Sequence, residues 1–281
     1  MRAGFIGLGE IGGPMAANLL AHGHSVDVYA RRPEVAEQYA ALGARVVGSP
    51  IEVGRDAEIV ILCLYTDEQV QAVALDDPTF LAGMRPGSAL VLHTTGRLDT
   101  ARRLAEQAAP LGIDVIDAPV SGSVADVTAG HITLLVGGPA AAVRRVAPAL
   151  SSYADPILHL GTVGTGQAAK LVNNTLLGVN VLLLNEAERI AQSLGMEPDL
   201  LVHALVHASG RSHVTEVAKE LGSIGAMTEF LRPFLRKDVA VVREVAGEMG
   251  TDLGLLGKVL TMARLSSNDA KTGSTNAGPA T

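Results

Sequence analysis

The sequence predicts a parallel, doubly wound α/β sheet followed by an all-helical domain. Short β-rich runs alternate with helical segments through the first half of the chain, and a glycine-rich turn follows the first run. Beyond about Leu160 only helical periodicity continues. These observations place an α/β domain at 1–161 and a helical domain at 162–267.

Eight runs rich in β-branched and other apolar residues have the length and composition of strands. They are AGFI (3–6), VDVY (26–29), ARVV (44–47), AEIVILCL (57–64), SALVL (88–92), DVIDA (114–118), HITLLVG (131–137) and PILHL (156–160). Helical segments such as 14–23 and 100–112 separate them. This alternation is typical of parallel strands joined by crossover helices.

The second domain opens with a long helix predicted at 165–194, which is apolar on nearly every side. A helix of this kind must be covered all round, so we expect a second subunit to complete its cover. The tail at 268–281 is rich in small polar residues with Gly and Pro, which predicts disorder.

Composition excludes several classes of protein. The formal net charge of −7 disfavours nucleic acid as a partner. One cysteine, Cys63, allows no disulfide within the chain, so a reducing cytoplasm is the expected compartment. The apolar run at 176–184 is shorter than the roughly 20 residues of a membrane span, and the N-terminus lacks the apolar segment of a signal peptide. We expect a cytoplasmic protein with no membrane partner.

The turn after the first strand has the spacing G-x-G-x-x-G of a Rossmann dinucleotide site. Gly7 permits the tight turn, Gly9 lets a pyrophosphate approach the backbone, and Gly12 allows close packing of helix and strand. The helix that follows offers amide donors to the phosphates. The predicted phosphate site is the whole turn: Gly7, Leu8, Gly9, Glu10, Ile11 and Gly12.

The residues after the second strand indicate which nicotinamide cofactor binds. An NAD site places Asp or Glu there for the ribose 2′-hydroxyl, and Asp27 lies too early within the strand for that role. Arg31 and Arg32 suit a 2′-phosphate instead. NADP is therefore the expected cofactor, with a solvated arginine pair as the alternative interpretation.

Lys170 and Asn174 are polar residues in a helix built for burial, four positions apart on one face. A carbonyl reductase needs a proton donor. A Tyr-x-x-x-Lys pair is absent, and one cysteine is too few for a typical catalytic zinc site, so no metal is expected. Lys170 is then the candidate acid/base, unless it only extends its ammonium group to solvent.

The loop DAPVSGS (117–123) follows the sixth strand, where open α/β sheets bind ligands. Its small residues can present amide and hydroxyl groups to an anion.

Taken together, these pieces resemble the β-hydroxyacid dehydrogenase family, which includes 3-hydroxyisobutyrate dehydrogenases and glyoxylate/succinic semialdehyde reductases. FIGLGEIGGPMAANL resembles the family's dinucleotide motif, DAPVSGS its substrate loop, GTGQAAKLVNN its catalytic helix and FLRKD (234–238) its C-terminal motif. The resemblance spans nearly the whole chain. It implies a Rossmann domain, a helical domain, and a homodimer or homotetramer.

The resemblance also implies roles for individual residues. Lys170 is the catalytic acid/base and Asn174 orients a small carboxylate-bearing aldehyde or hydroxy acid. The substrate carboxylate is assigned to Ser121, Gly122 and Ser123. The cofactor is assigned, besides the glycine turn, to Arg31, Leu64, Thr95, Lys237 and Asp238. The activity implied is an NADP-dependent interconversion of a short aldehyde or keto acid and its hydroxy acid.

Related enzymes differ at identifiable positions. Decarboxylating 6-phosphogluconate dehydrogenases carry His and Glu where this chain has Asn173 and Leu177. Imine reductases generally carry Asp or Tyr at the position of Lys170. An imine or phospho/sulfo-aldehyde reductase of the same fold is the alternative enzyme, and a non-catalytic NADP(H)-binding regulator is the alternative of another class. The roles of His93, His207 and Arg211 stay open.

Overall fold

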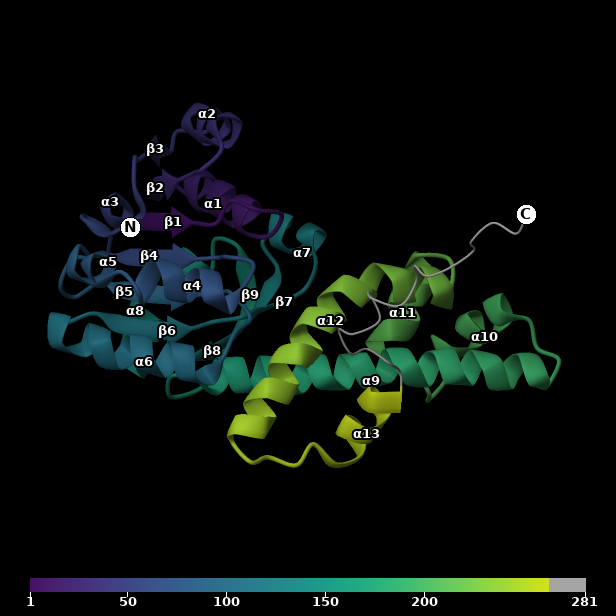
Figure 1. Ribbon diagram of the computed structural model, residues 1–281. Coiled ribbons are helices and arrows are strands. Elements are labelled where there is room, and N and C mark those ends of the chain that lie inside the picture. Colours follow the sequence, from purple (N-terminus) through teal and green to yellow (C-terminus); the bar gives the residue numbers. More distant parts are fainter. Residues whose placement is uncertain (263–281) are drawn as a thin grey trace, which may run out of the picture. The chain divides into compact units, whose positions relative to one another are not determined.

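The computed structural model describes residues 1–262, apart from the side chains of Phe234 and Met262 (Figure 1). Contacts within the chain separate two compact units, Met1–Lys170 and the described residues from Leu171 onward. The tail predicted at 268–281 lies outside the described residues, as does the end of the helical domain predicted at 162–267.

Within the described residues, the first unit is built on one nine-stranded sheet in the order β3-β2-β1-β4-β5-β6-β8-β7, with β9 paired to β8. The strands are β1 (Arg2–Ile6), β2 (Ser25–Tyr29), β3 (Arg45–Val46), β4 (Ile59–Leu62), β5 (Ala89–Leu92), β6 (Asp114–Asp117), β7 (Val120–Ser121), β8 (Ile132–Gly137) and β9 (Ala154–Gly161). All eight predicted runs form strands, and the two-residue β7 is an addition. From β3 to β6 every neighbouring pair is parallel.

The direction of β8 departs from the predicted parallel sheet. This strand runs antiparallel to β6 and β7 and parallel to β9. A parallel step needs a crossover that carries the chain back along the sheet, usually a helix. The connection from β6 to β8 holds only β7 and the five-residue α7 (Val124–Thr128), so the chain returns in the opposite direction.

Helices cover both faces of the sheet, as a doubly wound fold requires. One face packs against α1 (Gly12–Ala21), α2 (Pro33–Ala41), α7 and α8 (Ala140–Leu150). The other packs against α3 (Pro50–Gly54), α4 (Asp67–Ala74), α5 (Pro78–Ala82) and α6 (Leu98–Ala108), which the 3-10 turn Ala109–Leu111 extends. Adjacent strand residues such as Phe5 and Ile6 belong to opposite faces. Central strands are therefore apolar throughout, as in IVIL of β4.

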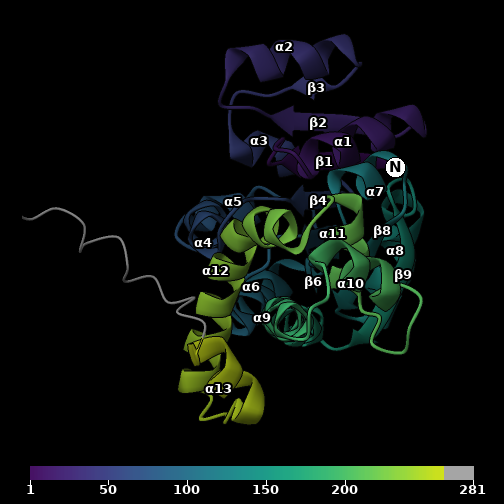
Figure 2. The same cartoon turned by 90° about the vertical axis from the view of Figure 1, so that its right-hand side faces the viewer.

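The second unit is helical. The helix α9 (Thr165–Ser193) continues from the first unit into it, followed by α10 (Pro198–Leu205), α11 (His213–Glu220), α12 (Ile224–Glu248) and α13 (Gly254–Met262). Figure 2 views α9 nearly end on, with α10, α11 and α12 around it. Val181 and Leu184 of α9 pack with Val214 and Met227 in the core of this unit.

A second side of α9 carries half-exposed apolar residues in this single chain. They are Val172, Leu176, Leu183 and Ile190. In the part of the chain that the structure describes, no helix is both long enough and apolar enough to cross a membrane.

Candidate active site

The glycine turn joins β1 to α1. Of its three motif glycines, only Gly9 has space where a side chain would stand. A Cβ at Gly7, where φ is +106°, would lie 2.1 Å from the Cys63 carbonyl oxygen, and one at Gly12 would lie 2.0 Å from the Gly7 oxygen. A Cβ at Gly9 would meet nothing within 4 Å, and Gly9 is exposed. Gly7 and Gly12 therefore close the turn, whereas Gly9 keeps its outer surface bare.

The other three residues of the turn differ in how far their side chains are buried. Leu8 and Ile11 pack against the core of the sheet and hold the turn in place. Glu10 is exposed. The bare backbone at Gly9 beside the first turn of α1 fits the approach of a phosphate to a helix N-terminus.

The charged residues of β2 and of the loop after it lie in different surroundings. Asp27 is buried and accepts a hydrogen bond from Arg45 Nε at 2.8 Å. Its carboxylate is thus engaged between β2 and β3 rather than presented beyond the strand. Arg31 is exposed in the loop that follows β2, and the neighbouring Arg32 lies 3.7 Å from Glu34.

Leu64 and Thr95 follow the carboxyl ends of β4 and β5, the sheet edge where open α/β folds bind ligands. The two loops are joined by Thr94, whose hydroxyl accepts a hydrogen bond from the Leu64 N–H at 3.0 Å. Both Leu64 and Thr95 are half-buried.

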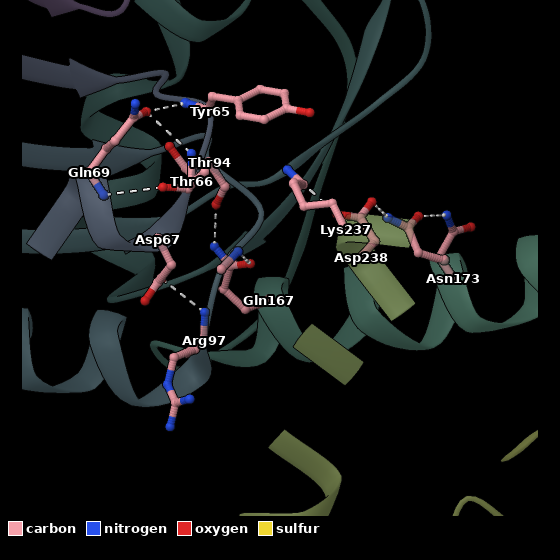
Figure 3. Close-up of polar contacts among 12 residues, drawn as sticks. Tyr65, Thr66, Asp67, Gln69, Thr94, Arg97, Gln167, Asn173, Lys237 and Asp238 are labelled. Atoms are coloured by element: carbon pink, nitrogen blue, oxygen red, sulfur yellow. Dashed lines mark hydrogen bonds and ion pairs between the residues drawn. The ribbon is translucent and has the colours of Figure 1, made fainter. Parts of the chain in front are cut away.

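Asp67, at the start of α4, extends this connection. Its buried carboxylate accepts a hydrogen bond from the Arg97 N–H at 3.0 Å (Figure 3). It also accepts from the Thr100 hydroxyl at 2.6 Å and from the Gln71 side chain at 2.7 Å. The loop after β5 is therefore held from the side of α4 and α6.

The first turn of α9 is fixed by two buried side chains. Asp117, the last residue of β6, accepts hydrogen bonds from the N–H groups of Gly164 and Gln167, both at 2.7 Å. Burial raises the pKa of Asp117, and these backbone donors oppose the shift. The Gln167 side chain accepts from the Gly96 N–H at 3.0 Å and donates to the Thr94 carbonyl at 2.8 Å (Figure 3).

Lys170 stands three residues beyond Gln167 on α9 and is half-buried. It is the last residue of the first unit. The helix turn that carries the candidate acid/base is thus connected through Gln167 to the loop of Thr95, and through Asp117 to the strand that leads into the substrate loop.

The three residues predicted to bind the substrate carboxylate differ in their hydrogen bonding. Ser121 ends β7 and is half-buried, and Gly122 has a φ of +140°. Ser123 caps α7: its N–H and hydroxyl both donate to Asp126 Oδ2, at 2.6 and 2.7 Å. Sequence reasoning treated Ser123 as a ligand, yet S-V-A-D also matches the capping box that this serine forms.

Asn174, Lys237 and Asp238 lie in the second unit. The buried Asn174 side chain donates a hydrogen bond to Asp238 Oδ2 and accepts one from Asn173 at 2.9 Å. Lys237 Nζ lies 3.5 Å from Asp238 Oδ1, an oxygen that has no hydrogen-bond partner among the described residues. Figure 3 shows Asn173, Lys237 and Asp238.

His93, whose role the sequence left open, is a buried residue at the end of β5. Its Nδ1 lies 2.6 Å from the Ala118 carbonyl and its Nε2 2.8 Å from the Tyr153 hydroxyl. A carbonyl only accepts, so Nδ1 carries the proton and the Tyr153 hydroxyl donates to Nε2. Burial lowers the pKa of His93 to about 4. The ring is therefore neutral and joins the β5 end to the start of the loop after β6.

The other two residues to which the sequence assigned no role lie in the second unit. His207 and Arg211 are exposed and line a shallow hollow after α10, and Arg211 lies 3.9 Å from Glu216. The His203 and His207 rings meet edge to face, with centroids 5.6 Å apart.

Comparison with known proteins identifies the chain. Residues 2–164 match the family model described as the NAD binding domain of 6-phosphogluconate dehydrogenase. Residues 164–278 match the model described as NAD-binding of NADP-dependent 3-hydroxyisobutyrate dehydrogenase.

Individual curated proteins are similar to this chain as well. A 3-hydroxyisobutyrate dehydrogenase of Pseudomonas aeruginosa is 38% identical over 73% of this chain and 69% of its own length. This chain belongs to the β-hydroxyacid dehydrogenase family. An NAD-dependent L-serine dehydrogenase of the same organism is 30% identical over 93% of this chain and 90% of its own.

Among solved structures, Mycobacterium tuberculosis 3-hydroxyisobutyrate dehydrogenase with L-serine superposes with a TM-score of 0.83 at 30% identity. The match covers 93% of this chain and 91% of that one. Membership of this family supports an NAD(P)-dependent hydroxyacid dehydrogenase activity on a small substrate.

Proposed function

We propose that the chain is an NADP-dependent oxidoreductase that interconverts a short aldehyde or keto acid and its hydroxy acid, with Lys170 as general acid/base. The observation that supports this most directly is the placement of Lys170. Its helix turn is bonded, through Gln167 and Asp117, to the ends of β5 and β6, and the glycine turn follows β1 of the same sheet.

The residues of the first unit fit a dinucleotide. Gly9 leaves backbone bare beside the start of α1, and Arg31 adds an exposed guanidinium beyond β2. When bound, the nicotinamide supplies a hydride donor or acceptor. We assign the 2′-phosphate to Arg31, and Leu64 and Thr95 to the walls that hold the cofactor. Lys237 and Asp238 remain predictions from the family resemblance.

Lys170 gives a proton to the substrate oxygen as the carbonyl carbon is reduced, and takes one back in the oxidative direction. The substrate carboxylate is assigned to the N–H groups and hydroxyl at Ser121 and Gly122. Because the Ser123 N–H and hydroxyl are bonded to Asp126, we assign Ser123 to shaping this loop. Asn174 is assigned to orienting the substrate.

The relatives suggest the substrate class. Their names specify 3-hydroxyisobutyrate and L-serine, both 3-hydroxypropanoic acids with one further substituent on the α-carbon. A carboxylate and a hydroxymethyl group attached to one carbon suit a loop with several amide N–H groups near one proton donor. We propose a homo-oligomer as the working form, because Val172, Leu176 and Leu183 are half-exposed on α9 of the single chain.

Substitution of Lys170 tests the assignment. NADPH oxidation is measured with glyoxylate, succinic semialdehyde, methylmalonate semialdehyde and tartronate semialdehyde, and NADP⁺ or NAD⁺ reduction with 3-hydroxyisobutyrate and L-serine. General acid/base groups contribute about 10²–10⁴-fold, so Lys170→Ala should lower kcat by that order. Lys170→Arg keeps the charge but cannot release a proton near neutral pH, so it should be similarly impaired.

Three results would overturn the proposal. Retention of most activity by Lys170→Arg would reduce Lys170 to an electrostatic anchor. Absence of turnover with every acid, alongside tight NADPH binding, would favour a regulator, and turnover of cyclic imines alone would favour an imine reductase.

A further inference from the structure

We propose that Gln167 is a positioning residue for the reaction: it clamps the backbone on both sides of Thr95 to the helix turn that carries Lys170. This inference rests on the proposed function, since it concerns the alignment of the cofactor-side loop with the proton donor. Gln167 lies within the motif GTGQAAKLVNN, but no role toward substrate or cofactor was assigned to it above.

The contacts of Gln167 define the clamp. Its side chain is only 2% exposed. Oε1 accepts a hydrogen bond from the Gly96 N–H at 3.0 Å, and Nε2 donates one to the Thr94 carbonyl at 2.8 Å. The carboxamide thus pairs with the loop at a donor and an acceptor, as a neighbouring peptide group would in a sheet.

The two bonded loop groups flank a single residue. Thr94 O and Gly96 N stand on either side of Thr95, the residue assigned to the cofactor. The Thr94 hydroxyl is itself bonded to the Leu64 N–H. Through the side chains of Gln167 and Thr94, the loops after β4 and β5 are therefore held to α9.

The same residue fixes the helix. The Gln167 N–H donates to Asp117 Oδ2 at 2.7 Å, so the backbone of Gln167 is held by β6 while its side chain holds the β5 loop. Lys170 follows by three residues, which is about one helical turn of 3.6 residues. A small rotation of this turn would move the Lys170 ammonium relative to Thr95.

A role in packing alone would not require a carboxamide side chain at position 167. A buried carboxamide loses solvation and gains stability only if its polar groups are paired. A methionine of similar length would fill the same space without that requirement. The polar side chain instead specifies one register between the helix and the loop, and a misplacement of about 1 Å in such a constellation can cost about 10²-fold in rate.

Two variants separate position from packing. Gln167→Met removes both hydrogen bonds and keeps the length. Gln167→Glu keeps the acceptor for the Gly96 N–H but sets a carboxylate oxygen against the Thr94 carbonyl, a contact that protonation would restore. Gln107, exposed on α6, gives matched controls as Gln107→Met and Gln107→Glu.

Three measurements test the clamp. Amide hydrogen exchange at Gly96 in the protein without ligand should accelerate at least about tenfold in Gln167→Met and less in Gln167→Glu, because only the first loses the acceptor of that N–H. With the identified substrate, kcat should fall about 10- to 100-fold in both Gln167 variants. The dissociation constant of NADPH, read from its fluorescence, should change less than about threefold.

The kinetic isotope effect and the pH profile distinguish misalignment from general damage. With 4-deuterated NADPH the isotope effect on kcat should rise in both variants, since hydride transfer becomes limiting. The activity of Gln167→Glu relative to the native enzyme should increase as the pH is lowered toward 5, whereas that of Gln167→Met should not.

The proposal is overturned if Gly96 exchange is unchanged in Gln167→Met, or if kcat stays within about threefold of the native value while exchange accelerates. It is also overturned if Gln107→Met causes the same losses. A native protein without turnover would instead refute the proposed function, and Gly96 exchange would still decide whether the clamp exists.

Discussion

Asp238 on α12 accepts a hydrogen bond from the side chain of Asn174 on α9, which connects two motifs 64 positions apart in the sequence. Both side chains are buried, Asn174 at 3% and Asp238 at 8% exposure. A buried carboxylate is costly unless it is paired. Asn174 therefore contributes to the stability of the helical unit as well as to any part it takes in binding substrate.

Replacement of Asn174 should lower stability. Asn174→Ala leaves Asp238 without this donor, which should cost about 1–3 kcal/mol of unfolding free energy. Asn174→Asp should cost more at neutral pH, because two carboxylates would then face each other. Urea unfolding measures both. The exposed Asn173 is the control, and an Asn173→Ala loss equal to that of Asn174→Ala would contradict the expected difference.

Gly9 and Gly12 should respond differently to a methyl group. A Cβ at Gly12 meets the Gly7 carbonyl at 2.0 Å, so Gly12→Ala should lower the unfolding free energy by about 2 kcal/mol or more. A Cβ at Gly9 meets nothing, so Gly9→Ala should fold normally and weaken NADPH binding about tenfold or more. Thermal unfolding and fluorescence titration test the pair, and equal NADPH affinity in Gly9→Ala would contradict the phosphate assignment.

Arg31 should set the choice of cofactor. Charge-assisted contacts to a 2′-phosphate are worth about 1.5–3 kcal/mol, or roughly ten- to hundredfold in affinity. The native protein should therefore prefer NADPH by kcat/KM, and Arg31→Asp should flatten or reverse the ratio. The exposed Arg55 provides the charge-matched control Arg55→Asp. A native preference for NADH would refute this assignment.

His93 should make stability depend on pH below neutrality. Burial lowers its pKa to about 4 in the folded protein from 6.5, so between these values the unfolded chain binds the extra proton. Stability is then fully retained above about pH 6.5 and falls as the pH drops toward 4, by roughly 3 kcal/mol in total at about 1.4 kcal/mol per unit.

Urea unfolding at pH 7, 6 and 5 measures this slope in the native protein and in His93→Asn, which cannot titrate. The variant should be less stable at pH 7 and flatter between pH 7 and 5. Parallel curves for the two proteins would mean that His93 is not the group responsible, and His131→Asn controls for an exposed histidine.

Features encoded locally could be predicted from the sequence. The spacing of Gly7, Gly9 and Gly12 fixes a turn, and alternation of strands and helices fixes the doubly wound sheet. The direction of β8 depends on the path of a connection that lacks a full helix, which periodicity does not reveal. The engagement of Ser123 was visible in principle, because S-V-A-D is a capping signature.

Long-range pairing limited the prediction of the site. Gln167 bonds to residues 71 and 73 positions earlier, and Asp117 to residues 47 and 50 positions later. A polar residue three positions before Lys170 in an apolar helix was the available signal for Gln167. Its partners could be identified only once β5, β6 and α9 were folded together.

The buried pair of His93 and Tyr153 also gives the protein an optical reporter. The sequence holds four tyrosines and no tryptophan, so near-ultraviolet absorption and intrinsic emission come from tyrosine without the usual dominant background. Tyr153 is fully buried and its phenol donates to a neutral imidazole. Its absorption band should therefore differ from that of solvated tyrosine, and difference spectra during acidification would follow the loosening of the β5 end separately from global unfolding.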